Sequence, residues 1–211
     1  MATAAGDRVR HFSMIRGFHL ADFFTLANAA SGVASIFAAI SFVESAQMVH
    51  FYVAAALLPV ALAFDILDGR IARWRQRTSS LGRELDSLSD VISFGVGPAV
   101  LAFAAGMRGT WDRAVLIYFV ACGVSRLARF NVTAEELSTG TDKVKYFEGT
   151  PIPTSVVLVG VLAAAAWLGR IGPDLWFGHV QLGSGVLHPL VLMFAVSGSL
   201  MISKTIRIPK I

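Results

Sequence analysis

Six stretches of the sequence are long and apolar enough to form helices across a lipid bilayer, and they leave too little chain for a separate soluble domain. A transmembrane helix needs roughly 20 mostly apolar residues. Charged residues make up only 15% of this chain, whereas soluble domains average about 25%. We therefore expect an all-α, polytopic integral membrane protein in which residues 1–211 form one membrane-embedded domain. The six expected transmembrane helices follow a short interfacial helix at 14–22 and cover residues 23–43, 49–67, 85–106, 114–128, 152–168 and 186–202.

The distribution of lysine and arginine predicts how the chain is oriented. With six spans, both termini, the connection between the second and third spans, and the region 126–145 lie on one side and hold nearly every basic residue. Only Arg108, Arg113 and Arg170 fall on the other side. Because basic residues collect on the cytoplasmic side of a membrane, we expect a multi-pass protein of the inner, cytoplasmic membrane with both termini cytoplasmic. The net charge of +4 then faces anionic lipid headgroups, and nothing beyond the charge itself supports binding of nucleic acid.

Four aspartates stand at the inner ends of two of these apolar windows. Asp65 and Asp68 are three residues apart and Asp86 and Asp90 are four apart, so each pair shares one face of a helix. The intervening segment GRIARWRQRTSSLGR is too polar to cross a membrane and must be a turn. We therefore expect the second and third spans to be antiparallel neighbours, with the two aspartate pairs facing each other near the cytoplasmic interface.

Carboxylates that converge in a cleft of low dielectric constant need positive charge between them, because burying an unpaired charge is costly. Mg2+ and Mn2+ take oxygen ligands and keep positions open for waters or substrate phosphates, so a site for two divalent cations fits these acids best. The alternative is that the acids cap helix ends or pair with arginines of the turn, such as Arg73. Gly69 and Gly82 favour a binding site, since a missing side chain lets a ligand approach the backbone, and Arg73 is suited to a phosphate.

The spacing D-x2-D-G-x2-A-R-x8-G-x3-D-x3-D occurs without a gap at Asp65, Asp68, Gly69, Ala72, Arg73, Gly82, Asp86 and Asp90. It is similar to the signature of the CDP-alcohol phosphotransferases, six-span membrane enzymes that move a phosphatidyl-type group from a CDP-linked donor to a small alcohol and release CMP. The resemblance implies that Asp65, Asp68 and Asp86 hold two metals, and that Asp90 reaches a metal and acts as general base toward the acceptor hydroxyl. It also implies a homodimer and a donor site lined by Gly69, Ala72, Arg73, Ser79 and Gly82.

Three further stretches resemble the phosphatidylserine synthase branch of that family, namely SRLARFNV, FEGTPIPTS and LDSLSDVISFGVGPA. This branch implies transfer of the phosphatidyl group from CDP-diacylglycerol to L-serine, giving phosphatidylserine and CMP. Arg126 and Arg129, at the end of the fourth span, and Asn131 are the expected ligands of the acceptor or of a donor phosphate. The alternative for both arginines is that they extend to lipid headgroups. In the first span, Thr25, Asn28 and Gly32 resemble a polar cluster of the same branch, and we expect Asn28 to face the bundle.

Other functions stay open at the level of the sequence. Within the same reaction class, the acceptor could be glycerol 3-phosphate or an inositol phosphate, and the donor could be an archaeal ether lipid. From a different class, the acids could form the ion path of a cation transporter. Transporter ion sites tend to lie near the bilayer midplane within internal repeats, whereas these acids lie at span ends and the sequence has no visible repeat.

Overall fold

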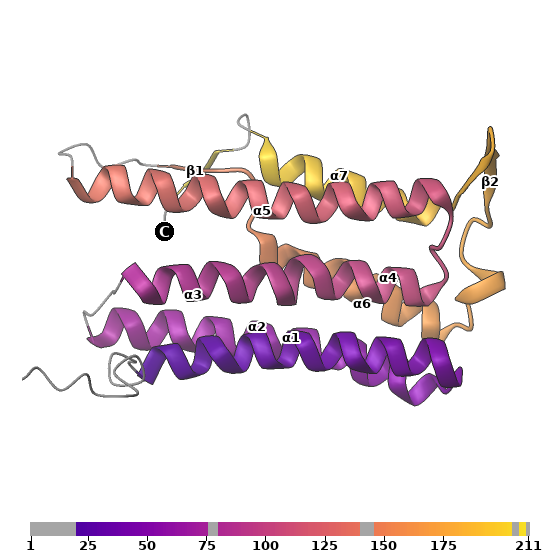
Figure 1. The fold of residues 1–211 in the computed structure, drawn as a ribbon, viewed down its shortest axis with the longest axis horizontal. Coiled ribbons are helices and arrows are strands. Elements are labelled where there is room, and N and C mark those ends of the chain that lie inside the picture. The colour runs from indigo at the N-terminus through magenta and orange to yellow at the C-terminus, as the bar shows by residue number, and fades with distance from the viewer. Residues whose placement is uncertain (1–19, 76–79, 140–145, 204–206, 210–211) are drawn as a thin grey trace, which may run out of the picture.

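The computed structural model of the chain describes residues 20–75, 80–139, 146–203 and 207–209, which are mostly helical (Figure 1). The all-α expectation is confirmed in the main, with two small two-stranded sheets added. Of the expected interfacial helix, residues 14–19 lie outside the described residues, and residues 20–22 belong to the first turn of α1. The helices are α1 (Leu20–Ser45), α2 (Met48–Arg75), α3 (Ser80–Asp90), η2 (Val91–Val96), α4 (Gly97–Ala105), α5 (Thr110–Thr139), η3 (Ile152–Thr154), α6 (Ser155–Trp167), η4 (Gly172–Asp174), η5 (Pro189–Val191) and α7 (Leu192–Ile202).

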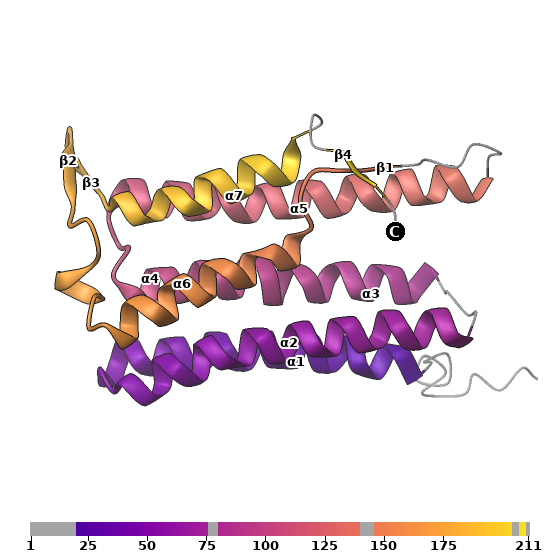
Figure 2. The same ribbon diagram turned by 180° about the vertical axis from the view of Figure 1, so that it is seen from behind.

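The long helices run along one axis in three layers (Figures 1 and 2). The helices α1 and α2 form one outer layer, α4 and α6 lie in the middle, and α5 and α7 form the other outer layer. Four stretches are long and apolar enough to cross a membrane: Leu20–Ser45, Met48–Ile71, Leu81–Ala105 and Thr110–Thr133. These helices make the chain a multi-pass membrane protein.

The last two apolar windows form short helices: the fifth, expected at 152–168, is Ile152–Trp167, and the sixth, expected at 186–202, begins later, as Pro189–Ile202. At about 1.5 Å per residue these helices reach roughly 24 Å and 21 Å, less than the hydrocarbon core of about 30 Å. Local sequence explains both limits. Gly169 adopts a φ of 68° just after α6, a conformation that ends a helix, and the first residues of the last window pair in a strand instead.

The helix α1 carries its polar residues inward and its apolar residues outward. Its buried face consists of Asp22, Thr25, Asn28, Ser31, Gly32, Ser35 and Ala39, whereas Phe37 on the outside is 64% exposed. The Ser35 hydroxyl donates to the Ala54 carbonyl of α2 at 2.7 Å. A continuous apolar outer face suits a lipid surrounding, and small or weakly polar residues let neighbouring membrane helices approach closely. The pattern therefore agrees with a bilayer around α1.

The third expected span is one helical rod with a wide turn in its middle. In Figure 1, α3 and α4 lie end to end, and the π-helix η2 joins them directly after Asp90. Inside η2, Ser93, Phe94 and Gly95 are buried. Wide π turns in α-helices are frequently found at functional sites. The turn here lies beside one of the four aspartates.

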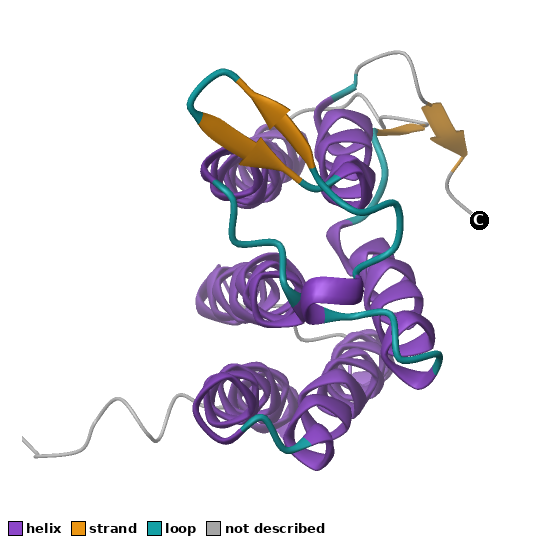
Figure 3. Cartoon of the chain, turned by 90° about the vertical axis from the view of Figure 1, so that its right-hand side faces the viewer, coloured by secondary structure: helices purple, strands orange, loops and turns teal. Residues whose placement is uncertain are grey.

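At the opposite end of the bundle, a buried aspartate holds the connections between helices. The strands β2 (Val180–Leu182) and β3 (Gly185–Leu187) form an antiparallel hairpin there, which lies in front of the helix ends in Figure 3. The Asp112 carboxylate of α5 accepts from the backbone N–H groups of Gly109 and His188, both at 2.8 Å, and lies 2.6 Å from the His188 ring Nδ1. Elsewhere, β1 (Tyr146–Glu148) pairs antiparallel with β4 (Arg207–Pro209).

Candidate metal centre

Three of the four aspartates meet between two helices, as the spacing of the sequence predicts. Asp65 and Asp68 lie one turn apart near the end of α2, and Asp86 lies on α3. One carboxylate oxygen from each of the three lies within 4.8 Å of the other two. The expectation that the two helices place these acids face to face is confirmed for these three residues. Asp90, one turn further along α3, is not part of this close group.

The chemistry of this group fits a divalent cation. The Asp68 side chain is only 6% exposed, and the buried Asp86 Oδ1 has no hydrogen-bond partner among the described residues. Among the residues that the structure describes, no ion pair joins the three carboxylates to a basic side chain. A buried carboxylate oxygen without a partner is costly, and three converging carboxylates repel one another. A hard cation with oxygen ligands would satisfy both needs.

The first helix supports two of the aspartates through polar side chains. The Thr25 hydroxyl donates to Asp68 Oδ2 at 2.7 Å, and the Asn28 amide Nδ2 donates to Asp90 Oδ1 at 3.3 Å. Asn28 is fully buried, which confirms that it faces the bundle. These contacts orient the carboxylates from a third helix. The sequence signal for them is the run of polar residues at spacings of three and four within an otherwise apolar span.

Close packing of α1 on the π-helix η2 fixes where Asn28 and Asp90 meet. The Ser93 hydroxyl donates to the Asn28 carbonyl at 3.0 Å. A Cβ added at Gly32 would lie 2.4 Å from Ser93 Oγ and 2.9 Å from Ser93 Cα. The second atom belongs to the backbone, so rotation of a side chain cannot relieve the contact. Gly32 is therefore the residue that allows α1 to reach the site.

Replacing Gly32 with Ala should destabilise the protein by about 1–3 kcal/mol, the usual cost of overpacking. The displaced α1 should also weaken the support of Asp90. Thermal unfolding of the purified variant measures the first effect. Gly160→Ala on α6 is the matched control, because a Cβ there meets nothing within 4 Å. Equal melting temperatures for the two variants would contradict the close approach described above.

The predicted donor-site residues are only partly described. A Cβ built at Gly69 meets nothing within 4 Å, so open space lies on that side of the helix, as a ligand that approaches the backbone requires. Gly82 lies on α3, half-buried, four residues before Asp86. Ala72 and Arg73 lie on α2, but their side chains are outside the described part of the structure, and Ser79 lies outside it altogether.

The three predicted acceptor residues lie on α5 in different surroundings. Arg126 is half-buried, its Nε has no hydrogen-bond partner among the described residues, and its charge lies within electrostatic range of Asp90. Arg129 is exposed. Asn131 donates from Nδ2 to Ser87 Oγ at 3.0 Å and to Glu84 Oε1 at 3.4 Å. Its amide thus ties α5 to α3, a contact that no spacing in the sequence indicates.

Comparison with known proteins identifies a family and several relatives with similar sequences. The family model described as CDP-alcohol phosphatidyltransferase matches residues 18–197. A CDP-diacylglycerol–serine O-phosphatidyltransferase of Saccharomyces cerevisiae is 44% identical over 208 residues, which cover 95% of this chain and 74% of the yeast protein. A protein of the same name from Helicobacter pylori is 43% identical over 64% of this chain and 53% of its own length. An archaetidylserine synthase of Methanothermobacter thermautotrophicus is 38% identical over 66% of this chain. The chain spans about half the length of these last two relatives.

Proposed function

The chain belongs to the CDP-alcohol phosphatidyltransferase family, and we propose that it transfers the phosphatidyl group of CDP-diacylglycerol to L-serine, forming phosphatidylserine and CMP. The observation that carries this proposal is the meeting of Asp65, Asp68 and Asp86 within 4.8 Å in a chain that is 44% identical to a yeast enzyme of that name. The hypothesis that these acids form the path of a transported cation has no support of comparable strength. A cation transporter is therefore the weaker hypothesis.

Asp65, Asp68 and Asp86 would hold two divalent cations, Mg2+ or Mn2+, and Asp90 would reach one of them. When bound, such ions neutralise the charge of the diphosphate and activate the leaving group. Gly69, Ala72, Arg73, Ser79 and Gly82 would line the site of the cytidine and the diphosphate. Thr25 keeps Asp68 turned into the group through its hydrogen bond of 2.7 Å.

Asp90 is the proposed general base. Its carboxylate accepts the proton of the serine hydroxyl as the hydroxyl oxygen attacks the phosphatidyl phosphorus. A new P–O bond forms to serine, the bond to the bridging oxygen breaks, and CMP leaves with that oxygen. The hydrogen bond from Asn28 at 3.3 Å holds Asp90 in one orientation. Because Asp90 is only 7% exposed, bulk water has little access to the proton it takes up.

Arg126 is the proposed partner of the acceptor carboxylate, with Arg129 further out and Asn131 holding α5 against α3. Its Nε is buried and has no hydrogen-bond partner among the described residues, and a guanidinium binds a carboxylate well. Glycerol 3-phosphate or an inositol phosphate as acceptor would bring a phosphate in place of the amino-acid group. One relative, named archaetidylserine synthase, favours an ether-lipid donor as the second candidate.

The proposed setting is the inner, cytoplasmic membrane, with one domain of six spans, both termini in the cytoplasm, and a homodimer as the working unit. Support for the orientation comes from the few basic residues, Arg108, Arg113 and Arg170, on the side away from the aspartates. The shorter α6 and α7 would cross by drawing the bilayer slightly thinner around them.

An acceptor panel tests the proposed function. Purified protein with CDP-diacylglycerol and Mn2+ should release CMP when L-serine is added, and should release little with glycerol 3-phosphate, inositol phosphate or no acceptor. Removal of divalent ions by a chelator should stop the reaction, and added Mn2+ should restore it. CMP release that persists after full chelation would contradict the metal site. If another acceptor gave faster CMP release than serine, the proposed type of reaction would stand, but serine would no longer be the proposed acceptor.

Changing Arg126 to Ala should raise the serine concentration needed for half-maximal rate by about tenfold or more, since a charged hydrogen bond is lost, and should change the donor requirement much less. Initial rates of CMP release at varied serine and varied donor measure both. Arg129→Ala, on the exposed side of α5, is the comparison and should raise the serine requirement less than Arg126→Ala does. A larger effect on the donor requirement than on serine would reassign Arg126 to the lipid phosphate.

A further inference from the structure

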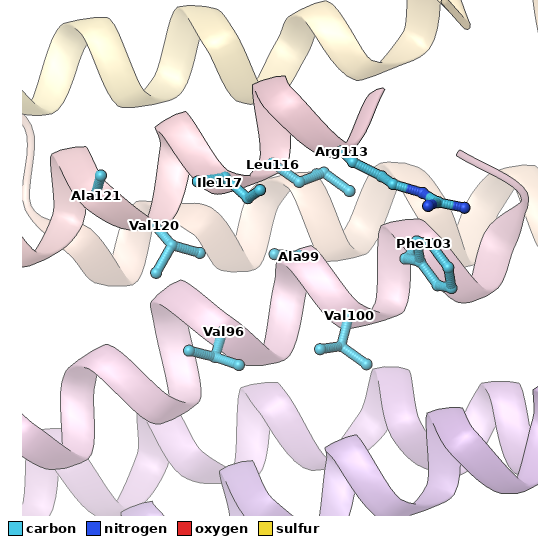
Figure 4. Close-up of a pocket in the computed structure, with 9 residues that line it drawn as sticks. All are labelled: Val96, Ala99, Val100, Phe103, Arg113, Leu116, Ile117, Val120 and Ala121. Atoms are coloured by element: carbon cyan, nitrogen blue, oxygen red, sulfur yellow. The ribbon is translucent and has the colours of Figure 1, made fainter. Parts of the chain in front are cut away.

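A groove of about 620 Å3 lies between α4 and α5, away from the aspartates (Figure 4). Its walls are apolar, with one charged residue, Arg113, among the described residues that line it. The groove opens to the outside of the bundle, since Ile117 in its wall is 70% exposed. Other lining residues are Val96, Val100, Phe103, Leu116 and Val120.

The length and position of the groove match one leaflet of a bilayer. The wall from Val96, the last residue of η2, to Phe103 on α4 extends about 10 Å, at about 1.5 Å per residue, and the α5 wall from Arg113 to Ala121 extends about 12 Å. Half of a hydrocarbon core is about 15 Å. Both walls lie within the stretches Leu81–Ala105 and Thr110–Thr133, which are long and apolar enough to cross a membrane. The groove thus runs from the end of the bundle opposite the aspartates toward the middle of the membrane.

Two arginines stand at the outer end of this groove. The guanidinium groups of Arg108 and Arg113 lie 5.5 Å and 5.7 Å from the centre of the Phe103 ring. Their Nε atoms donate to backbone carbonyls, Arg108 to Phe103 and Arg113 to Arg108. Neither forms an ion pair with a carboxylate in the described part of the chain, and both are exposed. This leaves two positive charges, held in place, where an apolar groove meets the membrane surface.

We propose that this groove binds one anionic phospholipid of the leaflet opposite the aspartate cluster. One acyl chain lies along the groove, and the headgroup phosphate contacts Arg113 and Arg108. Charge complementarity favours this occupant over a zwitterionic lipid, because the two guanidinium groups have no negatively charged partner among the residues that the structure describes. A lipid also suits the apolar walls, since hydrocarbon replaces hydrocarbon along the whole length of the groove.

Native mass spectrometry of the delipidated protein, titrated with phosphatidylglycerol and separately with phosphatidylcholine, tests the proposal. Wild-type protein should bind one phosphatidylglycerol more tightly than phosphatidylcholine. Arg113→Gln should weaken phosphatidylglycerol binding about fivefold, the usual effect of one basic residue near an anionic surface, and should weaken phosphatidylcholine binding less, because the choline cation already offsets the charge of its phosphate. Arg113→Lys should keep most of the preference. Ala121→Phe, which fills the groove, should weaken both lipids.

The controls separate the lipid from other occupants. Arg170→Gln removes a basic residue of the same end that does not line the groove, and it should bind lipid as the wild type does. CMP release by Arg113→Gln verifies that the variant is folded, because Arg113 lies far from the aspartates. Equal affinity of all variants for phosphatidylglycerol would overturn the proposal. Dissociation of an oligomer by Ala121→Phe without loss of lipid would overturn it in favour of a contact between two copies of the chain.

Discussion

Replacing Asp86 with Asn should lower the rate of CMP release by about 10³-fold or more. Asp86 brings the α3 oxygen to the group whose other members lie on α2, so its loss removes the bridge between the two helices. The remaining charge cannot hold cations that neutralise a diphosphate, and such neutralisation contributes several kcal/mol. The change from carboxylate to amide keeps the size of the side chain. The loss should therefore appear in turnover and in metal binding rather than in folding.

Two measurements and one control make this prediction specific. Titration with Mn2+, followed by its paramagnetic resonance signal, should show weakened binding in Asp86→Asn without any substrate present. Glu84→Gln on the same helix is the matched control, because Glu84 is exposed and accepts only a hydrogen bond of 3.4 Å from Asn131. It should retain both binding and turnover. Undiminished Mn2+ binding by Asp86→Asn would remove that residue from the metal site.

The sequence predicted the aspartate group well because the spacing within a helix determines which residues share a face. Helix geometry alone places Asp65 and Asp68 one helical turn apart on the same face. The polar connection between α2 and α3 makes these helices antiparallel neighbours, so Asp86 faces the pair. Asp90 could not be placed as closely. It ends α3 one turn beyond Asp86, and its surroundings depend on how α1 packs against it and against the π-helix η2, which the sequence does not indicate.

Contacts between distant helices were the part that the sequence could not supply. The hydrogen bond from Thr25 to Asp68 depends on how α1 packs on α2. The contacts of Asn131 with Ser87 and Glu84 depend on how α5 packs on α3. Hydropathy likewise marked the last span but not the residue at which its helix begins. The apolar window from residue 186 includes residues of β3, because strand and helix residues count equally toward hydropathy.

Replacing Asp90 with Asn should lower turnover by about 10²–10⁴-fold, the usual contribution of a general base, while leaving binding of the CDP-linked donor partly intact. An amide at this position keeps the shape of the side chain, and its Oδ1 can still accept the hydrogen bond that Asn28 donates to Asp90 at 3.3 Å. It cannot take up a proton from the serine hydroxyl. Single-turnover CMP release and equilibrium binding of the donor measure the two effects separately.

Mn2+ affinity should distinguish Asp90→Asn from Asp86→Asn. Asp90 is outside the group of three oxygens within 4.8 Å, so Asp90→Asn should retain most of its Mn2+ affinity, whereas Asp86→Asn should not. Asp174→Asn, an exposed substitution at the opposite end of the bundle, should behave as the wild type in both assays. Normal turnover by Asp90→Asn would remove it as the base. If Asp90→Asn lost donor and Mn2+ binding as completely as Asp86→Asn does, Asp90 would act chiefly as a metal ligand. Another group near Arg126 would then have to accept the proton.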